Sequence, residues 1–269
     1  MPRFAGRCFT SLMEPGPLTI SYAVASDVGQ RREANEDSVY TSPRLLAVAD
    51  GMGGHVAGEV ASSGAVAAIA ALDERLEAES AKADVEALAA AVSDAGARLR
   101  AQVEEDSRLQ GMGTTLTVLA WDGTSFAVAH VGDSRAYRLR EGELTQVTRD
   151  HTVVQELVDQ GRISPELAMS HPQRSVLTRA LQGVGEPEPD LFVVDARPGD
   201  RYLICSDGLS DVATPDQLTE VLTTVPTPEE AVQRLVELAN AGGGPDNISC
   251  IVADVAEVTG PADAADVAG

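Results

Sequence analysis

Residues 114–121 read TTLTVLAW, the pair Asp122-Gly123 follows, and residues 125–131 read SFAVAHV. Two apolar runs of strand length joined by Asp-Gly predict a β-hairpin, because this pair favours the positive backbone angles of a tight hairpin turn. Glu141-Gly142 gives a weaker form of the same signal further along the chain. At least part of the sheet is therefore expected to be antiparallel, which excludes a fold made only of wound βαβ units.

Apolar runs bounded by turn residues continue on both sides of this hairpin. We expect further strands over residues 19–25, 45–49, 135–140, 191–194, 202–205 and 248–253. Helical patterns predict long helices over about 58–76 and 84–103, a capped helix from Thr227-Pro228 to Gly242, and shorter helices after Asp150 and Ser164-Pro165. Strands with helices to cover both outer faces indicate a layered α+β sandwich with its core between two sheets.

The composition fits one domain with a substantial core. The chain has 269 residues, of which 43% are apolar, and no linker or repeat divides it. We expect a mobile N-terminal extension over residues 1–17, a single domain over 18–257, and a disordered acidic tail over 258–269.

The net charge of −22 opposes binding to nucleic acid or to an anionic membrane surface. The sequence contains no uninterrupted apolar stretch long enough for a secretory signal or a membrane span. The three cysteines lack metal-ligand spacing, and Cys205 and Cys250 are expected to be small core residues. These features predict a cytoplasmic protein.

Four aspartates stand at the ends of strand-like runs, each beside a small or turn-forming residue. They are Asp50 after residues 45–49, Asp133 after 126–132, Asp207 after 202–206, and Asp246 before 248–252. Any one of them could be only a turn residue, but strand ends that share a core would bring four carboxylates together. Such a group needs protons or cations, and oxygen-only ligands favour magnesium, manganese or calcium.

A second group of charged residues precedes Asp50. Arg32 offers a planar fork that suits two phosphate oxygens, while Glu36 and Asp37 can accept hydrogen bonds from metal-bound waters. Taken alone, the charged run at residues 31–33 is typical of a solvated turn. Its position just before Asp50 favours a place in the same site.

Seven segments together resemble the metal-dependent protein phosphatases of type 2C, in their bacterial serine/threonine form. In chain order they are SDVG at 26–29 with REANED at 32–37, VADGMGGH at 48–55 with AGE at 57–59, GTT at 113–115, HVGDSR at 130–135, TRDH at 148–151, CSDGL at 205–209 and GPDN at 244–247. The resemblance extends from about residue 21 to 255, and the segments follow the family's order and spacing.

This resemblance implies a four-layer α/β/β/α sandwich, in which two antiparallel sheets are flanked by helices and a small helical flap is inserted at about residues 151–174. It also implies two manganese or magnesium ions, with a weaker third, at one end of the sandwich. By position, the implied metal ligands are Asp50 between both ions, the Gly51 carbonyl on the second, Asp207 and Asp246 on the first, and Asp133 with Asp207 on the third. The implied phosphate-binding residue is Arg32, and Glu36, Asp37 and Asn247 stand behind the ligands.

The implied activity is hydrolysis of phosphoserine and phosphothreonine in proteins. Asp50, Asp207 and Asp246 would act catalytically through a hydroxide that bridges two ions. The partners would be Ser/Thr kinases and their phosphorylated substrates, and the protein would be a monomer that reverses bacterial kinase signalling. Animal relatives carry a histidine directly after the Asp-Gly pair, where this chain has Met52, so that general acid is not carried over. A loop-packing role is expected for His55, and a metal-bound water is the simpler proton donor.

Three other readings stay open from the sequence. The first is a phosphoprotein-binding pseudophosphatase, which the full set of carboxylates and Arg32 disfavours. The second is a calcium-binding module, although the chain lacks a contiguous Asp-x-Asp-x-Asp-Gly loop. The third is another two-metal phosphohydrolase, such as a phosphodiesterase.

Overall fold

The computed structural model of the chain describes residues 17–54 and 56–258. The strands are β1 (Leu18–Asp27), β2 (Asp37–Thr41), β3 (Leu45–Met52), β4 (Gly113–Thr114), β5 (Leu116–Trp121), β6 (Ser125–Val131), β7 (Arg135–Arg140), β8 (Glu143–Gln146), β9 (Leu181–Gln182), β10 (Asp190–Asp195), β11 (Arg201–Cys205) and β12 (Ile248–Glu257). The helices are α1 (Val56–Glu79), α2 (Val85–Glu105), the short 3₁₀ turn η1 (Ser107–Leu109), α3 (Val153–Asp159), α4 (Pro165–Met169), α5 (Asp207–Ser210), α6 (Pro215–Thr224) and α7 (Pro228–Ala241).

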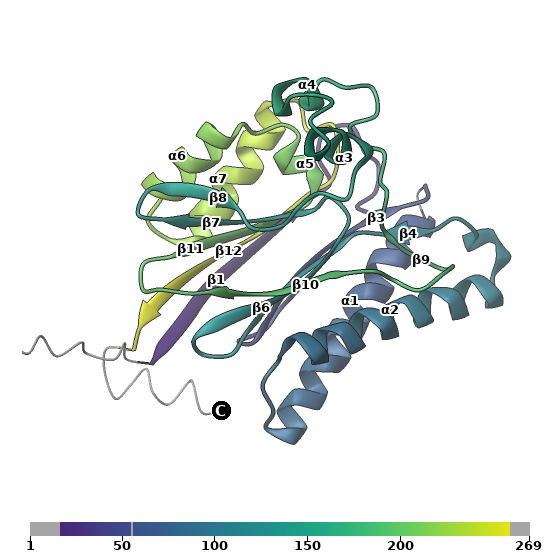
Figure 1. Cartoon of the computed structure of the whole chain (residues 1–269), viewed down its shortest axis with the longest axis horizontal. Helices are drawn as coiled ribbons and strands as arrows, with labels where there is room; N and C mark the ends of the chain where they lie inside the picture. The colour runs from purple at the N-terminus through teal and green to yellow at the C-terminus, as the bar shows by residue number, and fades with distance from the viewer. Residues whose placement is uncertain (1–16, 55, 259–269) are drawn as a thin grey trace, which may run out of the picture.

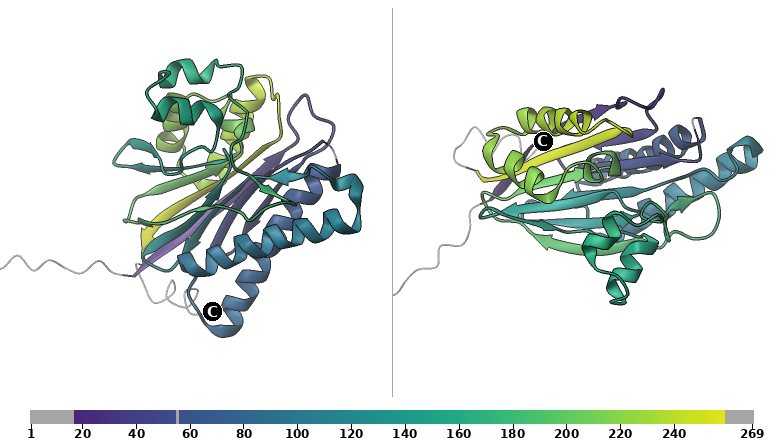
Figure 2. Two further views of the ribbon diagram at one scale, coloured as in Figure 1. Left: turned by 45° about the vertical axis from the view of Figure 1, so that its right-hand side comes forward. Right: turned by 90° about the horizontal axis from the view of Figure 1, so that it is seen from above.

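The strands form two antiparallel sheets that stack face to face, with helices on both outer faces (Figure 1). One sheet has the order β1-β12-β11-β7-β8, and the other has the order β10-β6-β5-β3-β4-β9 with β2 paired to β3. Helices α6 and α7 cover the first sheet, and α1 and α2 cover the second (Figure 2). The predicted α+β sandwich, with two antiparallel sheets flanked by helices, is confirmed.

Strand β3 shows why the apolar runs are continuous and do not alternate with polar residues. Leu45, Ala47 and Ala49 face the apolar layer shared with α1 and α2. Leu46 and Val48 face the layer between the two sheets. Successive side chains of a strand point to opposite faces, so a strand with helices on one side and a second sheet on the other is buried on both.

The turn signals of the sequence appear at the expected places. The carboxylate of Asp122 accepts hydrogen bonds from the backbone N–H groups of Thr124 and Ser125, both at 2.7 Å, in the hairpin between β5 and β6. Glu141 and Gly142, between β7 and β8, have φ angles of 53° and 83°, as a type I′ turn requires. The Thr227 side chain caps α7 by accepting from the Glu230 N–H at 3.2 Å.

Helix α6 and strand β2 were not among the predicted elements. Thr214 caps α6 with a reciprocal capping box to Gln217, and Pro215 occupies the first turn, so the sequence did carry a start signal there. Strand β2 has no comparable signal. All five of its residues are only partly buried, and its pairing with β3 determines its conformation.

Helix α1 is long and apolar enough to cross a membrane by length and composition alone. In the fold it packs between β3 and α2, with Ala61, Ala65, Ile69 and Leu72 buried along one side. This packing is typical of a core helix of a sandwich.

Between Thr152 and Leu177 the chain leaves the sheets and forms α3 and α4 (Figure 1). This excursion, called the flap below, projects at the end of the sandwich where α5 lies. Thr152 and Ser164 cap its two helices through their side-chain oxygens. The flap therefore begins and ends at one end of the stacked sheets.

Candidate metal centre

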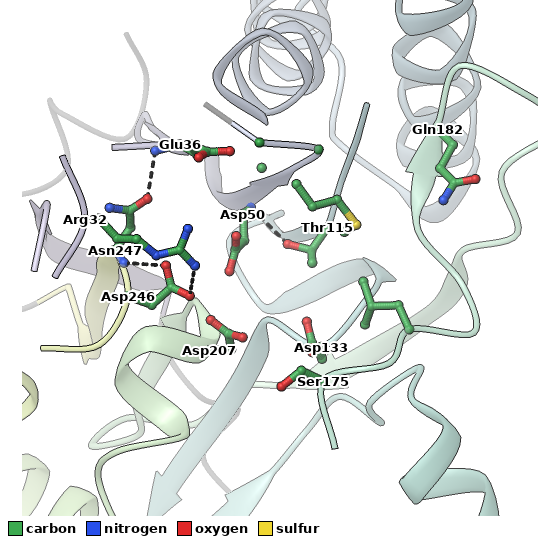
Figure 3. Close-up of a pocket in the computed structure, with 15 residues that line it drawn as sticks. Arg32, Glu36, Asp50, Thr115, Asp133, Ser175, Gln182, Asp207, Asp246 and Asn247 are labelled. Atoms are coloured by element: carbon green, nitrogen blue, oxygen red, sulfur yellow. Dashed lines mark hydrogen bonds and ion pairs between the residues drawn. The ribbon is translucent and has the colours of Figure 1, made fainter. Parts of the chain in front are cut away.

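Strand register and strand ends bring the predicted carboxylates together at that end of the sandwich. Asp50 lies near the end of β3, directly opposite Asp37 at the start of β2. Asp133 lies in the turn between β6 and β7, and Asp207 begins α5 immediately after β11. Asp246 stands two residues before β12, and Figure 3 shows four of these side chains pointing toward one another.

A cavity of about 430 Å³ lies over this cluster. Eight of the nine predicted site residues line it: Arg32, Glu36, Asp50, Gly51, Asp133, Asp207, Asp246 and Asn247. Asp37 is the exception: it is partly buried outside the cavity lining, where its carboxylate accepts a hydrogen bond from Ser206 Oγ at 2.8 Å. The structure therefore gathers the predicted residues in one place, and the role of each residue stays a prediction.

Two threonines hold the main chain of Asp50. The Asp50 N–H donates to Thr115 Oγ1 at 3.0 Å, and Thr114 Oγ1 donates to the Asp50 carbonyl at 2.9 Å. The Thr115 N–H donates to the same carbonyl at 2.9 Å. Because the main chain is fixed from both sides, the position of the Asp50 carboxylate depends on its side-chain torsions alone.

Asn247 ties the loop that carries Arg32 to the start of β12. Its Nδ2 donates to the carbonyls of Val28 and Ala34 at 3.0 and 2.9 Å, and its Oδ1 accepts from the Glu36 N–H at 2.8 Å. These three bonds engage both polar atoms of the amide. Asn247 therefore stabilises the shape of the site through the backbone of the loop that carries Arg32.

Glycine is required at Gly51 by close packing. A Cβ at this position would lie 2.2 Å from the carbonyl oxygen of Gly58 and 2.5 Å from that of Glu36. The Gly51 N–H also donates to the Glu36 carbonyl at 3.2 Å. The glycine of this Asp-Gly pair is therefore required by packing, and both residues lie inside β3 and not in a turn.

Burial and mutual repulsion raise the pKa values of the cluster. Burial raises the pKa of Asp207 to about 8 with help from Asp133, and raises that of Asp133 to about 7 with help from Asp150. Burial, and then Asp37 and Asp207, hold the pKa of Asp50 well above its ordinary value. Carboxylates in this position require protons or cations.

Arg32 contributes the positive charge at the cavity. Its Nη2 lies 2.6 Å from Asp246 Oδ2, and its side chain is 46% exposed. Arg31 is exposed, as expected for a surface residue. His55 lies outside the described residues, as do residues 1–16 and 259–269 of the two predicted terminal segments.

The donor set fits a hard divalent cation. The converging groups are carboxylate oxygens, and Asp37 Oδ1 is buried without a hydrogen bond from the described residues. Across the described ranges, no three histidine, cysteine, aspartate or glutamate side chains already form a complete ligand arrangement. Asp246 is instead paired with Arg32. The carboxylates therefore converge without forming a finished coordination sphere.

Sequence reasoning missed part of the cavity. Ser175 and Leu177 reach it from the end of the flap, and Gln182 reaches it from β9. These residues follow no strand-like run and form no motif, so no local signal could have placed them. Thr115 belonged to a quoted segment, yet its hydrogen bond to Asp50 depends on the pairing of β3 with its neighbours.

Comparison with known proteins gives a consistent result. The protein phosphatase 2C family model matches residues 30–241. The serine/threonine protein phosphatase PstP of Mycobacterium tuberculosis is 53% identical over 241 residues, which cover 89% of this chain and 46% of PstP. The chain therefore spans about half the length of that relative. Serine/threonine phosphatase stp of Listeria monocytogenes is 36% identical over 85% of this chain and 93% of its own length.

Solved structures agree with the sequence matches. The crystal structure of the PstP catalytic domain in complex with two manganese ions is 50% identical, with a TM-score of 0.82, and covers 89% of this chain and 100% of that one. The match extends over most of the chain and over both sheets that carry the acidic cluster. The chain belongs to the protein phosphatase 2C family.

Proposed function

We propose that this chain is a manganese- or magnesium-dependent phosphatase that hydrolyses phosphoserine and phosphothreonine in proteins. The observation that carries the proposal is the convergence of Asp50, Asp133, Asp207 and Asp246 with Arg32 on one cavity. The PstP and stp relatives are named serine/threonine phosphatases, and the PstP catalytic domain was crystallised with two manganese ions. An all-oxygen donor set agrees with these metals.

The site residues divide into ligands and supports. Asp50, Gly51, Asp207 and Asp246 are proposed to hold the two main ions, and Asp133 with Asp207 a third. Three residues are proposed to keep the ligands in place. Asp37 accepts a hydrogen bond from Ser206, the Glu36 carbonyl accepts one from the Gly51 N–H, and Asn247 binds the backbone of the loop that carries Arg32. Outer residues of this kind commonly change metal affinity by about 10–100-fold when substituted.

Two-metal sites supply activation of water and compensation of charge on the phosphoryl group. The chain's own contribution to substrate binding is Arg32, whose half-exposed guanidinium pairs with Asp246 and lies within reach of an incoming phosphate. The described lining residues include no histidine. For protonation of the departing serine or threonine oxygen we propose water in the cavity, which is the simpler donor.

The finer context of the activity is also a proposal. Phosphorylated proteins are the proposed substrates, and Ser/Thr kinases with their targets are the proposed partners. The net charge of −22 argues against nucleic acid as a partner. A monomer in the cytoplasm, acting against kinase signalling, is the arrangement we propose.

The decisive experiment measures phosphate release from a phosphothreonine peptide with manganese, calcium or EDTA. Asp50→Asn is compared with Asp94→Asn, which removes an exposed carboxylate on α2. We expect release only with manganese, loss in Asp50→Asn and full release in Asp94→Asn. Folded, metal-loaded protein without release would favour a pseudophosphatase. Calcium binding without hydrolysis would favour a calcium module, and cleavage of a phosphodiester in preference to the peptide would favour another phosphohydrolase.

A further inference from the structure

The two ends of the flap meet in a short hydrogen-bonded neck, formed by residues 151–153 and 176–178. Thr152 and Leu177 form an isolated antiparallel bridge. The Val153 N–H donates to the Val176 carbonyl at 2.9 Å, and the Thr178 N–H donates to the His151 carbonyl at 2.8 Å. The flap is therefore tied together where it joins the sandwich.

His151, at the first residue of this neck, binds both polar groups of Gly132. Its backbone N–H donates to the Gly132 carbonyl at 2.8 Å, and its ring Nδ1 accepts from the Gly132 N–H at 3.1 Å. The His151 side chain is fully buried. Because Nδ1 is an acceptor and burial lowers the ring's pKa, the neutral ring carries its proton on Nε2.

Two neighbours orient the ring from its other side. Nε2 lies 3.2 Å from Asp190 Oδ2, close enough for electrostatic attraction although the N–H is not aligned for a full hydrogen bond. Asp190 is in turn paired with Arg179 at 2.8 Å. The His130 ring packs against the His151 ring with centroids 4.8 Å apart. The Nδ1 atom is thereby directed at Gly132.

Gly132 is held equally closely on the side of the metal centre. Its φ angle is 109°, and a Cβ there would lie 2.6 Å from the Thr115 side chain. Thr115 is the residue whose hydroxyl accepts from the Asp50 N–H. The peptide before Asp133 is therefore clamped between the flap neck on one side and Thr115, which binds Asp50, on the other.

We propose that His151, oriented by Asp190, is a positioning residue that fixes the Asp133 carboxylate relative to the neck of the flap. It acts through Gly132 and touches neither substrate nor metal. Leu177 lies in the same neck and lines the cavity, so a displacement of the flap's base is transmitted to Asp133. The inference rests on the proposed function in one respect, which is that Asp133 holds a metal ion.

Two substitutions separate the clamp from simple packing. An Asn side chain places its Oδ1 where His has Nδ1, so His151→Asn keeps the acceptor for Gly132. A Gln side chain places its polar atoms near the Nε2 position, so His151→Gln loses that acceptor. The matched control is His171→Gln, because His171 in the flap also accepts a backbone N–H at Nδ1, from Gln173 at 3.2 Å.

The test is a calorimetric manganese titration of the 269-residue chain and of each variant, with melting temperatures measured in parallel. In His151→Gln we expect the weakest manganese site to lose affinity by about 10–100-fold while the tighter pair is kept. His151→Asn and His171→Gln should retain that site. Asp190→Ala should also weaken the weakest manganese site. Because the Asp190 side chain is 35% exposed, this variant replaces His151→Gln in the test if His151→Gln does not fold.

The outcomes separate this inference from the proposed function. Equal loss of the weak site in His151→Asn and His151→Gln would overturn the inference alone, and so would an unchanged weak site in folded His151→Gln or Asp190→Ala. A wild-type protein that binds no manganese would overturn the proposed function together with the inference. A lower melting temperature with unchanged manganese binding would show that His151 acts only in packing.

Discussion

The cavity has a floor and a wall that are built in different ways. The floor, formed by Asp50, Asp133, Asp207 and Asn247, lies at the ends of paired strands in both sheets. The wall, formed by Ser175, Leu177 and Gln182, comes from the chain that returns from the flap. Long antiparallel ladders set the floor, whereas an isolated bridge and the two-residue strand β9 set the wall. The proposed chemistry therefore belongs to the most firmly paired part of the fold, whereas the wall belongs to a separate segment, to which we assign the fit of substrate as a proposal.

The largest expected effect is on the floor. Asp207→Asn should reduce manganese-dependent phosphate release by more than about 100-fold, since even outer residues of metal sites commonly account for 10–100-fold. The substitution removes a charge assigned to two metal positions. Asp133→Asn should weaken turnover less and leave the main pair bound. Calorimetric titration that finds every manganese site intact in Asp207→Asn would contradict the ligand assignment.

A second substitution disturbs the backbone packing of the floor. Gly51→Ala should destabilise the fold by about 1–3 kcal/mol, because the atoms that its Cβ would meet at 2.2 and 2.5 Å are backbone carbonyl oxygens. Urea denaturation measures the change. Gly64→Ala in α1 is the control, since the nearest atoms that its Cβ would meet, at 3.2 and 3.4 Å, belong to the side chains of Gln102 and Leu99 and not to the backbone. It should be neutral or stabilising by about 0.5–1 kcal/mol. Equal destabilisation by both would refute the packing argument.

A third change tests the wall. Deletion of residues 163–169, which removes α4, should lower kcat/KM for a phosphoprotein about 10-fold more than for p-nitrophenyl phosphate, because only the larger substrate extends beyond the cavity. Wild-type protein assayed on both substrates supplies the reference ratio. Equal losses of kcat/KM on the two substrates would show that the flap only stabilises the floor. The floor and the wall would then not have separate roles.

The floor was predictable from sequence for a physical reason. An apolar run followed by Asp-Gly is a local signal for the end region of a buried strand, and strands of one core bring such ends together. Asp50 and Asp207 carried that signal. Asp37 carried only part of it, because its position opposite Asp50 depends on the register of β2 against β3 and on the hydroxyl of Ser206.

The wall and the clamp on Asp133 were not predictable in the same way. Ser175 and Gln182 lie in segments without periodicity, and the return path of the flap places them. His151 appeared in a quoted segment, but its two bonds to Gly132 join residues 19 positions apart in sequence. Contacts of that kind depend on tertiary packing, which no single segment encodes.

The smallest expected effects concern stability and pH. Burial raises the pKa of Asp133 to about 7 and that of Asp207 to about 8, whereas in the unfolded chain both return to about 3.9. The folded protein without metal therefore binds more protons than the unfolded chain, and its free energy of unfolding falls as the pH rises through that range. With EDTA, we expect a lower melting temperature at about pH 8.5 than at about pH 6.5.

This pH window avoids the opposing effect of two histidines. Burial lowers the pKa of both His130 and His151. Their contribution to the free energy of unfolding therefore rises with pH only up to about 6.5, which is the pKa of histidine in the unfolded chain. Manganese should remove the difference between the two pH values, because cations then replace the protons. A melting temperature that rises with pH in EDTA would contradict the raised carboxylate pKa values.

The same argument predicts that Asp207→Asn has opposite effects on activity and on metal-free stability. At about pH 8.5 with EDTA the variant should melt above wild type, by about 2–4 °C per kcal/mol gained, because a neutral amide avoids the repulsion from Asp133, Asp211 and Asp246. At about pH 6.5 the gain should shrink, since wild-type Asp207 is then mostly protonated. Saturating manganese should reverse the order, because only wild type is stabilised by all its sites. Asp94→Asn should show none of these shifts. If Asp207→Asn melted below wild type in EDTA at both pH values, the floor would owe its stability to hydrogen bonds of that carboxylate, and the argument that its carboxylates repel one another would fail.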